Sequence, residues 1–134
     1  MRALLLTLAL AACTTMAPGT PAVHLSGTSW TMDDADSAPH WPTISFLDAR
    51  AYGFDGCNSW FASVEQSGEE LRFVRIGTTR RACEAAPAAA AERRFLDALA
   101  ATRYGHYDQD VLVLLDAQQH QLARFNNDSS PPPR

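Results

Sequence analysis

The feature that most constrains this fold is the stretch Gly53–Phe61, which reads Gly-Phe-Asp-Gly-Cys-Asn-Ser-Trp-Phe. It combines a tight turn, the cysteine Cys57 and two aromatic residues after a polar corner. A second cysteine follows at Cys83, and an even pair of cysteines in an exported domain favours a disulfide. Closing a loop of about 25 residues would stabilise the fold by roughly 3.5 kcal/mol. Two buried thiols or a metal-binding pair are the alternatives, although no CxxC spacing typical of zinc sites is present.

The expectation of export rests on the start of the chain. One arginine precedes an apolar run over residues 3–10, and Ala11-Ala12-Cys13 ends it. The run is too short to span a bilayer, so residues 1–12 are predicted to be a secretory signal peptide. Its end resembles the bacterial lipobox, which predicts that Cys13 is acylated. The alternative is ordinary cleavage near Ala12 that leaves Cys13 as a free thiol.

The composition of both ends of the remaining chain predicts that they are unstructured. Residues 13–24 contain two prolines and a glycine and are predicted to be a flexible tether. Residues 127–134 include three consecutive prolines and are predicted to be a disordered tail. Thr14 stands where Gram-negative lipoproteins of the inner membrane tend to have Asp. The resemblance therefore predicts a location at the outer membrane, facing the periplasm.

The charge of the chain argues against a nucleic-acid partner. The formal net charge is -4, and all 11 basic residues are arginine. Binding to phosphates requires clustered basic residues. The arginines at 80–81 and 93–94 form pairs and no longer run, so no nucleic-acid binding is expected.

Between tether and tail, short alternating segments predict strands over 25–32, 43–47, 51–54, 58–65 and 71–76. The last of these places Leu71, Phe73 and Arg75 on one face. A helix is predicted over 85–103, where Pro87 suits the first turn. Its apolar stripe contains Ala91, Phe95, Ala98, Leu99 and Thr102. Strands are expected again from 104, over 111–115 and over 120–125, which makes an antiparallel α+β domain over residues 25–126.

A series of short motifs runs through this domain. Trp30 lies on the opening strand, and Gly56-Cys57-Asn58 precedes two aromatic residues. Thr79-Arg80-Arg81-Ala82-Cys83 follows, and Glu92-Arg93-Arg94-Phe95 lies on the helix. The ordered series resembles the META domain of HslJ-like proteins over about residues 25–125. Ala62 stands where that family usually has a glycine.

The resemblance implies a curved antiparallel β-sheet (a partial barrel) packed on one main α-helix. It also implies a small extracytoplasmic domain, in a family whose members are often lipoproteins and have no general catalytic activity. Trp30, Gly56, Cys57, Asn58, Thr79, Ala82, Cys83 and Glu92 are then structural motif residues.

An active site around Cys57 is the competing interpretation. Asp55 and Asn58 lie beside it, and Arg80 and Arg81 precede Cys83. A thiol nucleophile requires an unpaired sulfur and a nearby base, and no histidine is close in sequence. Asp55 and Asn58 are therefore read as turn formers. Asn58 is a candidate for hydrogen bonds to the backbone of residues 78–83.

The four histidines lack the spacing of a metal site. A weak metal site remains open if His106 and His120 are neighbours across strands. Trp41 lies in a predicted loop, where it either caps the core or offers a contact point. No metal and no cofactor is expected.

The sequence therefore favours a lipid-anchored, non-enzymatic domain of the cell envelope, either a partner-binding protein that binds or supports another envelope protein or a stress-related accessory protein. Its binding face would be the open side of the sheet or the mouth between sheet and helix. A small carrier of a hydrophobic ligand or a metal is the alternative.

Overall fold

A computed structural model of the chain describes residues 24–37, 39–108 and 110–128. The predicted signal peptide, the predicted acylation site Cys13 and nearly all of the predicted tether lie outside these ranges. So do residues 129–134 of the predicted tail. β8 runs through Asn127, one residue into the segment predicted as tail.

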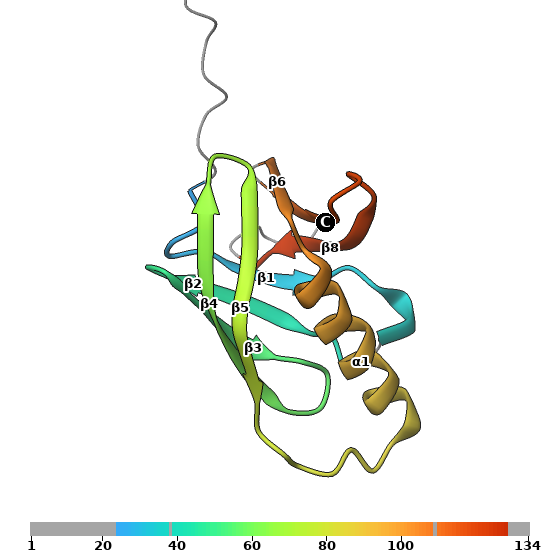
Figure 1. The fold of residues 1–134 in the computed structure, drawn as a ribbon. Coiled ribbons are helices and arrows are strands. Elements are labelled where there is room, and N and C mark those ends of the chain that lie inside the picture. The colour runs from blue at the N-terminus through green and yellow to red at the C-terminus, as the bar shows by residue number, and fades with distance from the viewer. Residues whose placement is uncertain (1–23, 38, 109, 129–134) are drawn as a thin grey trace, which may run out of the picture.

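Eight antiparallel strands follow one another around a ring, and one α-helix is inserted between the fifth and sixth strands (Figure 1). The strands are β1 (Ser29–Met32), β2 (Thr43–Leu47), β3 (Arg50–Phe54), β4 (Ser59–Ser67), β5 (Glu70–Thr78), β6 (Tyr104–Asp108), β7 (Val111–Leu115) and β8 (Gln121–Asn127). The helix is α1 (Ala86–Ala101), and a short 3-10 turn, η1 (Ala35–Ser37), precedes β2. The expected antiparallel α+β architecture with a single helix is confirmed.

The ring closes because β1 pairs with β8 as well as with β2, with Met32 opposite Phe125. The sheet therefore has no open β1 edge, unlike the partial barrel that we expected. The weakest junction joins β5 to β6, where Glu70 and Tyr104 are the one registered pair. α1 runs beside β5 and contacts it, so the helix covers the region where this pairing ends (Figure 1).

Aromatic side chains fill the interior of the ring. Trp30, Trp60, Phe95 and Phe125 are each at most 1% exposed. The Phe95 ring, from α1, packs edge-to-face against Trp60 at 5.3 Å and against Phe125 at 6.3 Å. Such pairs add about 0.5–1.5 kcal/mol each beyond the burial of their area. The predicted helix stripe is confirmed, because all five of its residues are buried.

A β-bulge interrupts β5 at Arg75. Leu71 and Phe73 point into the core as predicted, but Arg75 is exposed and has a φ of 53°. The register between β4 and β5 shifts between Phe61 and Ser63. The prediction that Arg75 shares the face of Leu71 and Phe73 is wrong, because a bulge inserts one residue and reverses the alternation. Ile76 packs against the core instead.

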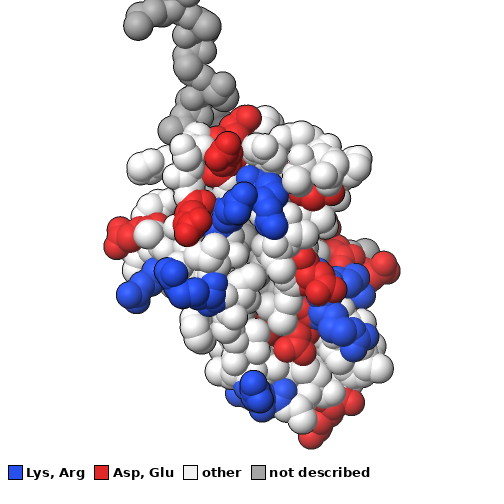
Figure 2. Space-filling model, viewed as in Figure 1, with Lys and Arg blue, Asp and Glu red and all other residues white. Residues whose placement is uncertain are grey.

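Charged residues are mixed on the face shown in Figure 2, where small groups of arginines alternate with aspartates and glutamates. This face therefore presents no continuous basic surface of the kind that tracks a phosphate backbone. In the described part of the chain, no helix is long and apolar enough to cross a membrane.

Candidate functional site

The outer face of β3 and β4 carries exposed aromatic side chains. Tyr52 and Phe61 lie opposite each other in register and are 48% and 59% exposed. Phe54, two residues after Tyr52, is 36% exposed on the same strand. Strand alternation explains their position, because Ala51 and Ala62, which are adjacent to Tyr52 and Phe61 in sequence, point into the core. A group of exposed aromatic side chains is typical of an interaction surface.

The Phe61 ring lies over Gly77 on β5. A Cβ atom added at Gly77 would come within 2.5 Å of Phe61 Cζ, so the ring lies directly against the β5 backbone. A side chain at position 77 would displace it. The absence of a side chain at Gly77 thus leaves room for the Phe61 ring against β5.

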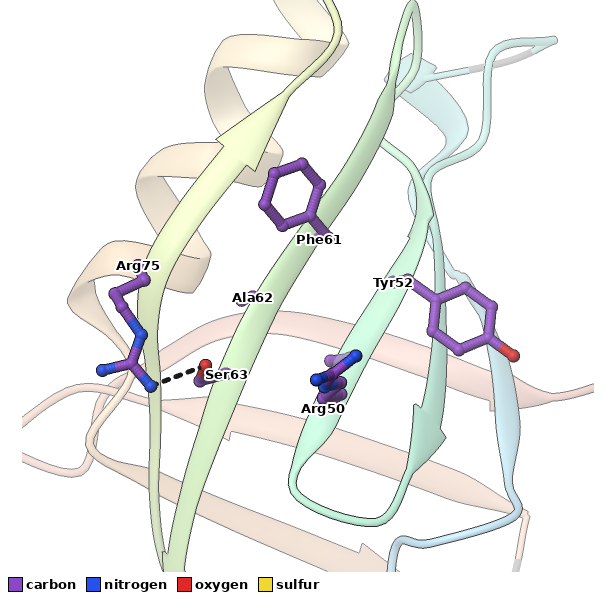
Figure 3. Close-up of a pocket in the computed structure, with 7 residues that line it drawn as sticks. Arg50, Tyr52, Phe61, Ala62, Ser63 and Arg75 are labelled. Carbon is purple, nitrogen blue, oxygen red and sulfur yellow. Dashed lines mark hydrogen bonds between the residues drawn. The ribbon is translucent and has the colours of Figure 1, made fainter.

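Tyr52 and Phe61 border a hollow of about 430 Å³, which we call the β3–β5 groove (Figure 3). Its polar lining consists of Arg50, Ser63 and Arg75, with Tyr52 and Phe61 beside them. A second hollow of about 540 Å³ adjoins the groove, since Arg50, Ser63 and Arg75 line it as well. Together the two hollows follow the direction of β4.

The groove is electropositive. Ser63 lies opposite Arg50 in the β3–β4 register, and Arg75 Nη2 donates a hydrogen bond of 2.8 Å to Ser63 Oγ (Figure 3). No aspartate or glutamate lines the groove itself. In the described part of the chain, neither arginine takes part in an ion pair. Two guanidinium groups with no carboxylate among the lining residues of the groove are chemically suited to an anionic group.

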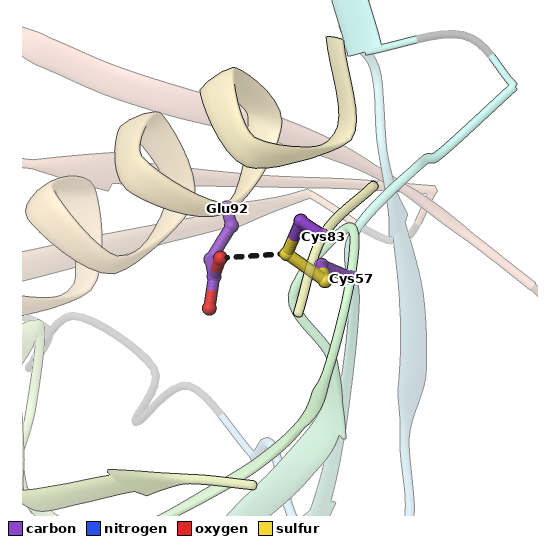
Figure 4. Close-up of side chains that lie close together, drawn as sticks. All are labelled: Cys57, Cys83 and Glu92. Carbon is purple, nitrogen blue, oxygen red and sulfur yellow. Dashed lines mark hydrogen bonds between the residues drawn. A yellow bond between two sulfur atoms is a disulfide. The ribbon is translucent and has the colours of Figure 1, made fainter. Parts of the chain in front are cut away.

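The motif residues gather at a different place, which we call the disulfide corner. It consists of residues 55–58, residues 79–83 and Glu92. Cys57 and Cys83 are joined by a disulfide, with their Cα atoms 5.7 Å apart (Figure 4). The bond ties the start of β4 to the segment that enters α1. Trp30 is the motif residue that lies elsewhere, in the core, where Trp30 Nε1 donates to Thr28 Oγ1.

Asp55 and Gly56 build the turn of this corner. Asp55 Oδ1 accepts hydrogen bonds from the backbone N–H groups of Cys57 (2.9 Å) and Asn58 (2.6 Å), as expected of a turn former. Asp55 Oδ2 is buried and accepts no hydrogen bond from the described residues. Gly56 has a φ of 106°, and a Cβ there would lie 3.0 Å from Ala91 Cβ. Both the conformation and the space require glycine.

Asn58 connects the corner to the neighbouring segments. Its Oδ1 accepts from the Arg81 backbone N–H (2.7 Å) and from Thr79 Oγ1 (3.2 Å). Its Nδ2 donates to the Arg81 carbonyl (3.2 Å) and to Glu92 Oε1 (3.2 Å). The expected bonding of Asn58 to the backbone of residues 78–83 is confirmed. Ala82 is exposed at the surface of this loop.

Glu92 brings a carboxylate beside the disulfide, with Oε2 3.1 Å from Cys83 Sγ (Figure 4). Cys57, Cys83 and Glu92 are the one group of three potential metal ligands that the described residues bring within 4.8 Å of one another. Metal ions bind cysteine as the thiolate, and the two sulfurs are bonded to each other instead. The same bond leaves no thiol for the catalytic interpretation, so the corner acts as a structural tie.

The histidines are separated in the structure. His106 lies on β6 with its Nδ1 3.7 Å from Glu69 Oε1, and His120 precedes β8 with its Nδ1 3.3 Å from Asp116 Oδ2. β7 pairs with both β6 and β8 and lies between them. The possibility of a site formed by His106 and His120 on neighbouring strands is therefore contradicted. The backbone N–H of His120 is the main cause that holds the pKa of Asp116 below its usual range.

The loop before β2 is fastened to α1 by an ion pair. Asp34 Oδ2 accepts hydrogen bonds from Ser37 Oγ (2.7 Å) and from Arg94 Nη2 (3.3 Å). The Ser37 hydroxyl, followed by the Asp36 backbone N–H and Arg94, holds the pKa of Asp34 below its usual range. Trp41 lies farther along this loop and is 47% exposed, so it does not cap the core.

A comparison with family models matches the chain to the META domain over residues 23–129. The chain belongs to the META domain family. In this META domain, Gly56-Cys57-Asn58 and the segment ending at Cys83, on which the resemblance is based, form the disulfide corner. Comparison with curated proteins finds no match.

Solved structures support the fold of this META domain. An NMR structure of a protein from Burkholderia xenovorans is 18% identical, with a TM-score of 0.66 over 90% of this chain and 99% of that one. A crystal structure of a duf4847 family protein from Bacteroides vulgatus is 13% identical, with a TM-score of 0.60 over 80% of this chain and 96% of that one. At these identities the likeness concerns the fold alone.

Sequence reasoning missed the β3–β5 groove. The outward positions of Tyr52 and Phe61 follow from the alternation of their strands, so the exposure of these two side chains could have been predicted. Nothing local in the sequence marks Arg75 as a bulge residue, and the approach of Arg50 and Arg75 to Ser63 depends on pairing across three strands.

Proposed function

We propose that this META domain is a lipid-anchored, non-enzymatic accessory protein of the cell envelope, which acts by binding another envelope protein through the β3–β5 groove. The observation that carries the proposal is the exposed pair of Tyr52 and Phe61 beside Arg50 and Arg75, which form no ion pair with the described residues. Aromatic residues and arginine are the side chains most enriched at the energetic centres of protein interfaces.

The pairing of β1 with β8 argues against strand addition at the place where the sheet would otherwise be open. β1 and β8, which would be the edges of an open sheet, pair with each other. Their backbone groups are therefore used within the domain, and a partner strand has no free edge there. The outer face of β3–β5 offers an exposed apolar surface instead.

The interior of the ring favours this function over carriage of an apolar ligand. Four large aromatic side chains, each at most 1% exposed, occupy the centre of the ring. A ligand inside would have to displace these packed side chains, because protein interiors hold few voids larger than a water molecule. The groove, by contrast, is open without any rearrangement.

The lipid anchor belongs to the same proposal. Acylation of Cys13 would hold the domain at the outer membrane, and residues 14–24 would give it reach to a partner in the periplasm. Processing of the precursor that is blocked by globomycin, and acyl labelling that disappears in Cys13→Ala, are the expected results. Unchanged labelling in that variant would contradict the anchor and leave the groove proposal in place.

Photo-crosslinking in cells tests the groove directly. Benzoylphenylalanine replaces Phe61 in the full-length chain, and in a matched control it replaces Arg93, which is exposed on α1. We expect a discrete cross-linked band with an envelope protein from position 61, reduced when Tyr52 is also changed to Ala. Equal cross-linking from position 93, or none from position 61, would refute the proposal.

A further inference from the structure

We infer that the β3–β5 groove recognises an extended peptide segment of a partner protein in which a carboxylate lies two residues from an apolar side chain. The inference rests on the proposed function and specifies the chemistry of the partner. The carboxylate binds between Arg50 and Arg75, and the apolar side chain lies on Tyr52 and Phe61.

The arginines supply the first argument. They flank Ser63 on two sides, one as its cross-strand partner and the other through a hydrogen bond of 2.8 Å. An anion that lies between two cations attracts both and so offsets their mutual repulsion. The groove itself has no acidic residue, although the chain as a whole has 15 acidic and 11 basic residues. A ligand carboxylate supplies the missing counterion, and Ser63 Oγ–H adds a donor.

The backbone at Arg75 supplies the second argument. Arg75 is one of three described residues other than glycine with a positive φ, and the other two, Asp48 and Gln119, lie in turns or beside them. A bulge within a long strand, with a large side chain in the left-handed region, is a strained arrangement. It reverses the alternation of β5 so that the guanidinium reaches Ser63 across the outer face (Figure 3). Bulges commonly reorient side chains in this way beside binding sites.

The spacing of the lining residues defines the ligand. Along β4, the outward residues Phe61, Ser63 and Glu65 are two residues apart, or about 6.6 Å per step in an extended strand. Phe61 marks an aromatic position, and Ser63 marks a basic one because Arg50 and Arg75 flank it. Glu65 marks an acidic position, together with Asp48 in the adjoining hollow. An extended peptide has the same spacing between alternate side chains. The matching segment therefore carries an apolar, an acidic and a basic residue at positions i, i+2 and i+4, in either chain direction.

The acidic residues of the adjoining hollow distinguish a peptide from a lipid surface. An anionic bilayer would attract Arg50 and Arg75 but would repel Asp48 and Glu65, which lie in the adjoining hollow. A peptide with alternating charges satisfies both sets of charges. The observations thus favour a protein segment over phospholipid headgroups.

NMR titration of the isotope-labelled domain with short peptides tests the inference. The probe is an acetylated and amidated peptide with the order Phe-Ala-Glu-Ala-Lys, used together with its reversed sequence. We expect saturable chemical-shift changes at the amides of Phe61, Ser63 and Arg75. The affinity should fall about fivefold when Glu in the probe is replaced by Gln. Binding should also weaken at high salt, because exposed charges are screened.

Protein variants complete the test. Arg50→Gln and Arg75→Gln should each weaken binding of the Glu probe and leave binding of the Gln probe unchanged, while the exposed control Arg93→Gln should affect neither. Equal binding of the Glu and Gln probes, or shifts confined to another surface, would overturn the inference. Arginine-dependent binding to vesicles that contain phosphatidylglycerol, without peptide binding, would overturn it in favour of a membrane surface.

The two proposals fail separately. If position 61 cross-links to an envelope protein with equal yield in the Arg50→Gln and Arg75→Gln backgrounds, partner binding stands and the carboxylate inference is wrong. If no cross-link forms from position 61 in any background, the proposed function itself is wrong.

Discussion

Replacing Asn58 by alanine should be among the most damaging single changes outside the aromatic core. Asn58 is 5% exposed, and its side chain makes four hydrogen bonds of 2.7–3.2 Å. Three join neutral groups, at about 0.5–1.5 kcal/mol each, and the bond to the Glu92 carboxylate is worth about 1.5–3 kcal/mol. Thr79 and Arg81 are exposed, so their groups regain water in the variant. We therefore expect a loss of about 2–4 kcal/mol.

Equilibrium unfolding in urea measures this loss. The domain without residues 1–12 is followed by tryptophan fluorescence, in the absence of reductant so that the disulfide stays closed. Ser59→Ala is the matched control, because Ser59 is adjacent and exposed and should change stability by less than about 0.5 kcal/mol. A loss below about 1 kcal/mol in Asn58→Ala would refute the argument that these bonds hold the corner together.

A second substitution distinguishes the acceptor role of Asn58 Oδ1 from the donor role of Nδ2. Asn58→Asp keeps the acceptor for the Arg81 N–H but places a carboxylate where Nδ2 donates to Glu92. At neutral pH this variant should be at least as unstable as Asn58→Ala, because two anions are then adjacent. It should recover relative to the wild type as the pH is lowered and one of the carboxylates is protonated. No recovery on acidification would contradict the assigned orientation of the amide.

Three further predictions concern the disulfide, the glycines and pH. Changing Cys83 to Ser should cost about 3.5 kcal/mol, because the bond spans a sequence separation of 26; alkylation of both Cys57 and Cys83 in the native protein would contradict it. Gly56→Ala should cost about 2–4 kcal/mol, since the residue has a positive φ and Ala91 lies close by. Gly68→Ala is its control, because it also has a positive φ but open space around it, and should cost about 1–2 kcal/mol in urea unfolding. The pKa of Asp34 is lowered in the folded state, so the unfolded chain binds its proton more readily. The stabilisation contributed by the Asp34 carboxylate is therefore fully present above about pH 4 and is lost as the pH falls through the folded-state pKa. Asp34→Asn should flatten the decline in thermal stability below that pH, and an unaltered decline would show that another group causes it.

Residues whose structure depends on local periodicity were predictable. The stripe on α1 that contains Phe95 and Leu99 is buried as expected, because a helix with 3.6 residues per turn brings such positions to one face. Asp55 builds the turn before Cys57 because its short carboxylate reaches N–H groups two and three residues ahead. The pairing of Cys57 with Cys83 followed from a count of cysteines, and it is present in the structure.

Residues whose position depends on several strands at once were not predictable. The β5 alternation that grouped Arg75 with Phe73 holds for an ideal strand, but a bulge is visible only once the pairing with β4 is known. His106 and His120 lie on either side of β7, and no local pattern reports which strand lies between two others.

The sequence by itself determined the family, the helix face, the corner turn and the inward or outward direction of most strand residues, since each depends on neighbours within a few positions. Only the tertiary structure decided that β1 meets β8 and closes the ring, and that Arg50 and Arg75 flank Ser63 beside Phe61. Both depend on how register and twist accumulate around eight strands. A single shifted residue at the bulge moves a side chain from the core to the surface, so the groove could be seen only after the whole ring was in place.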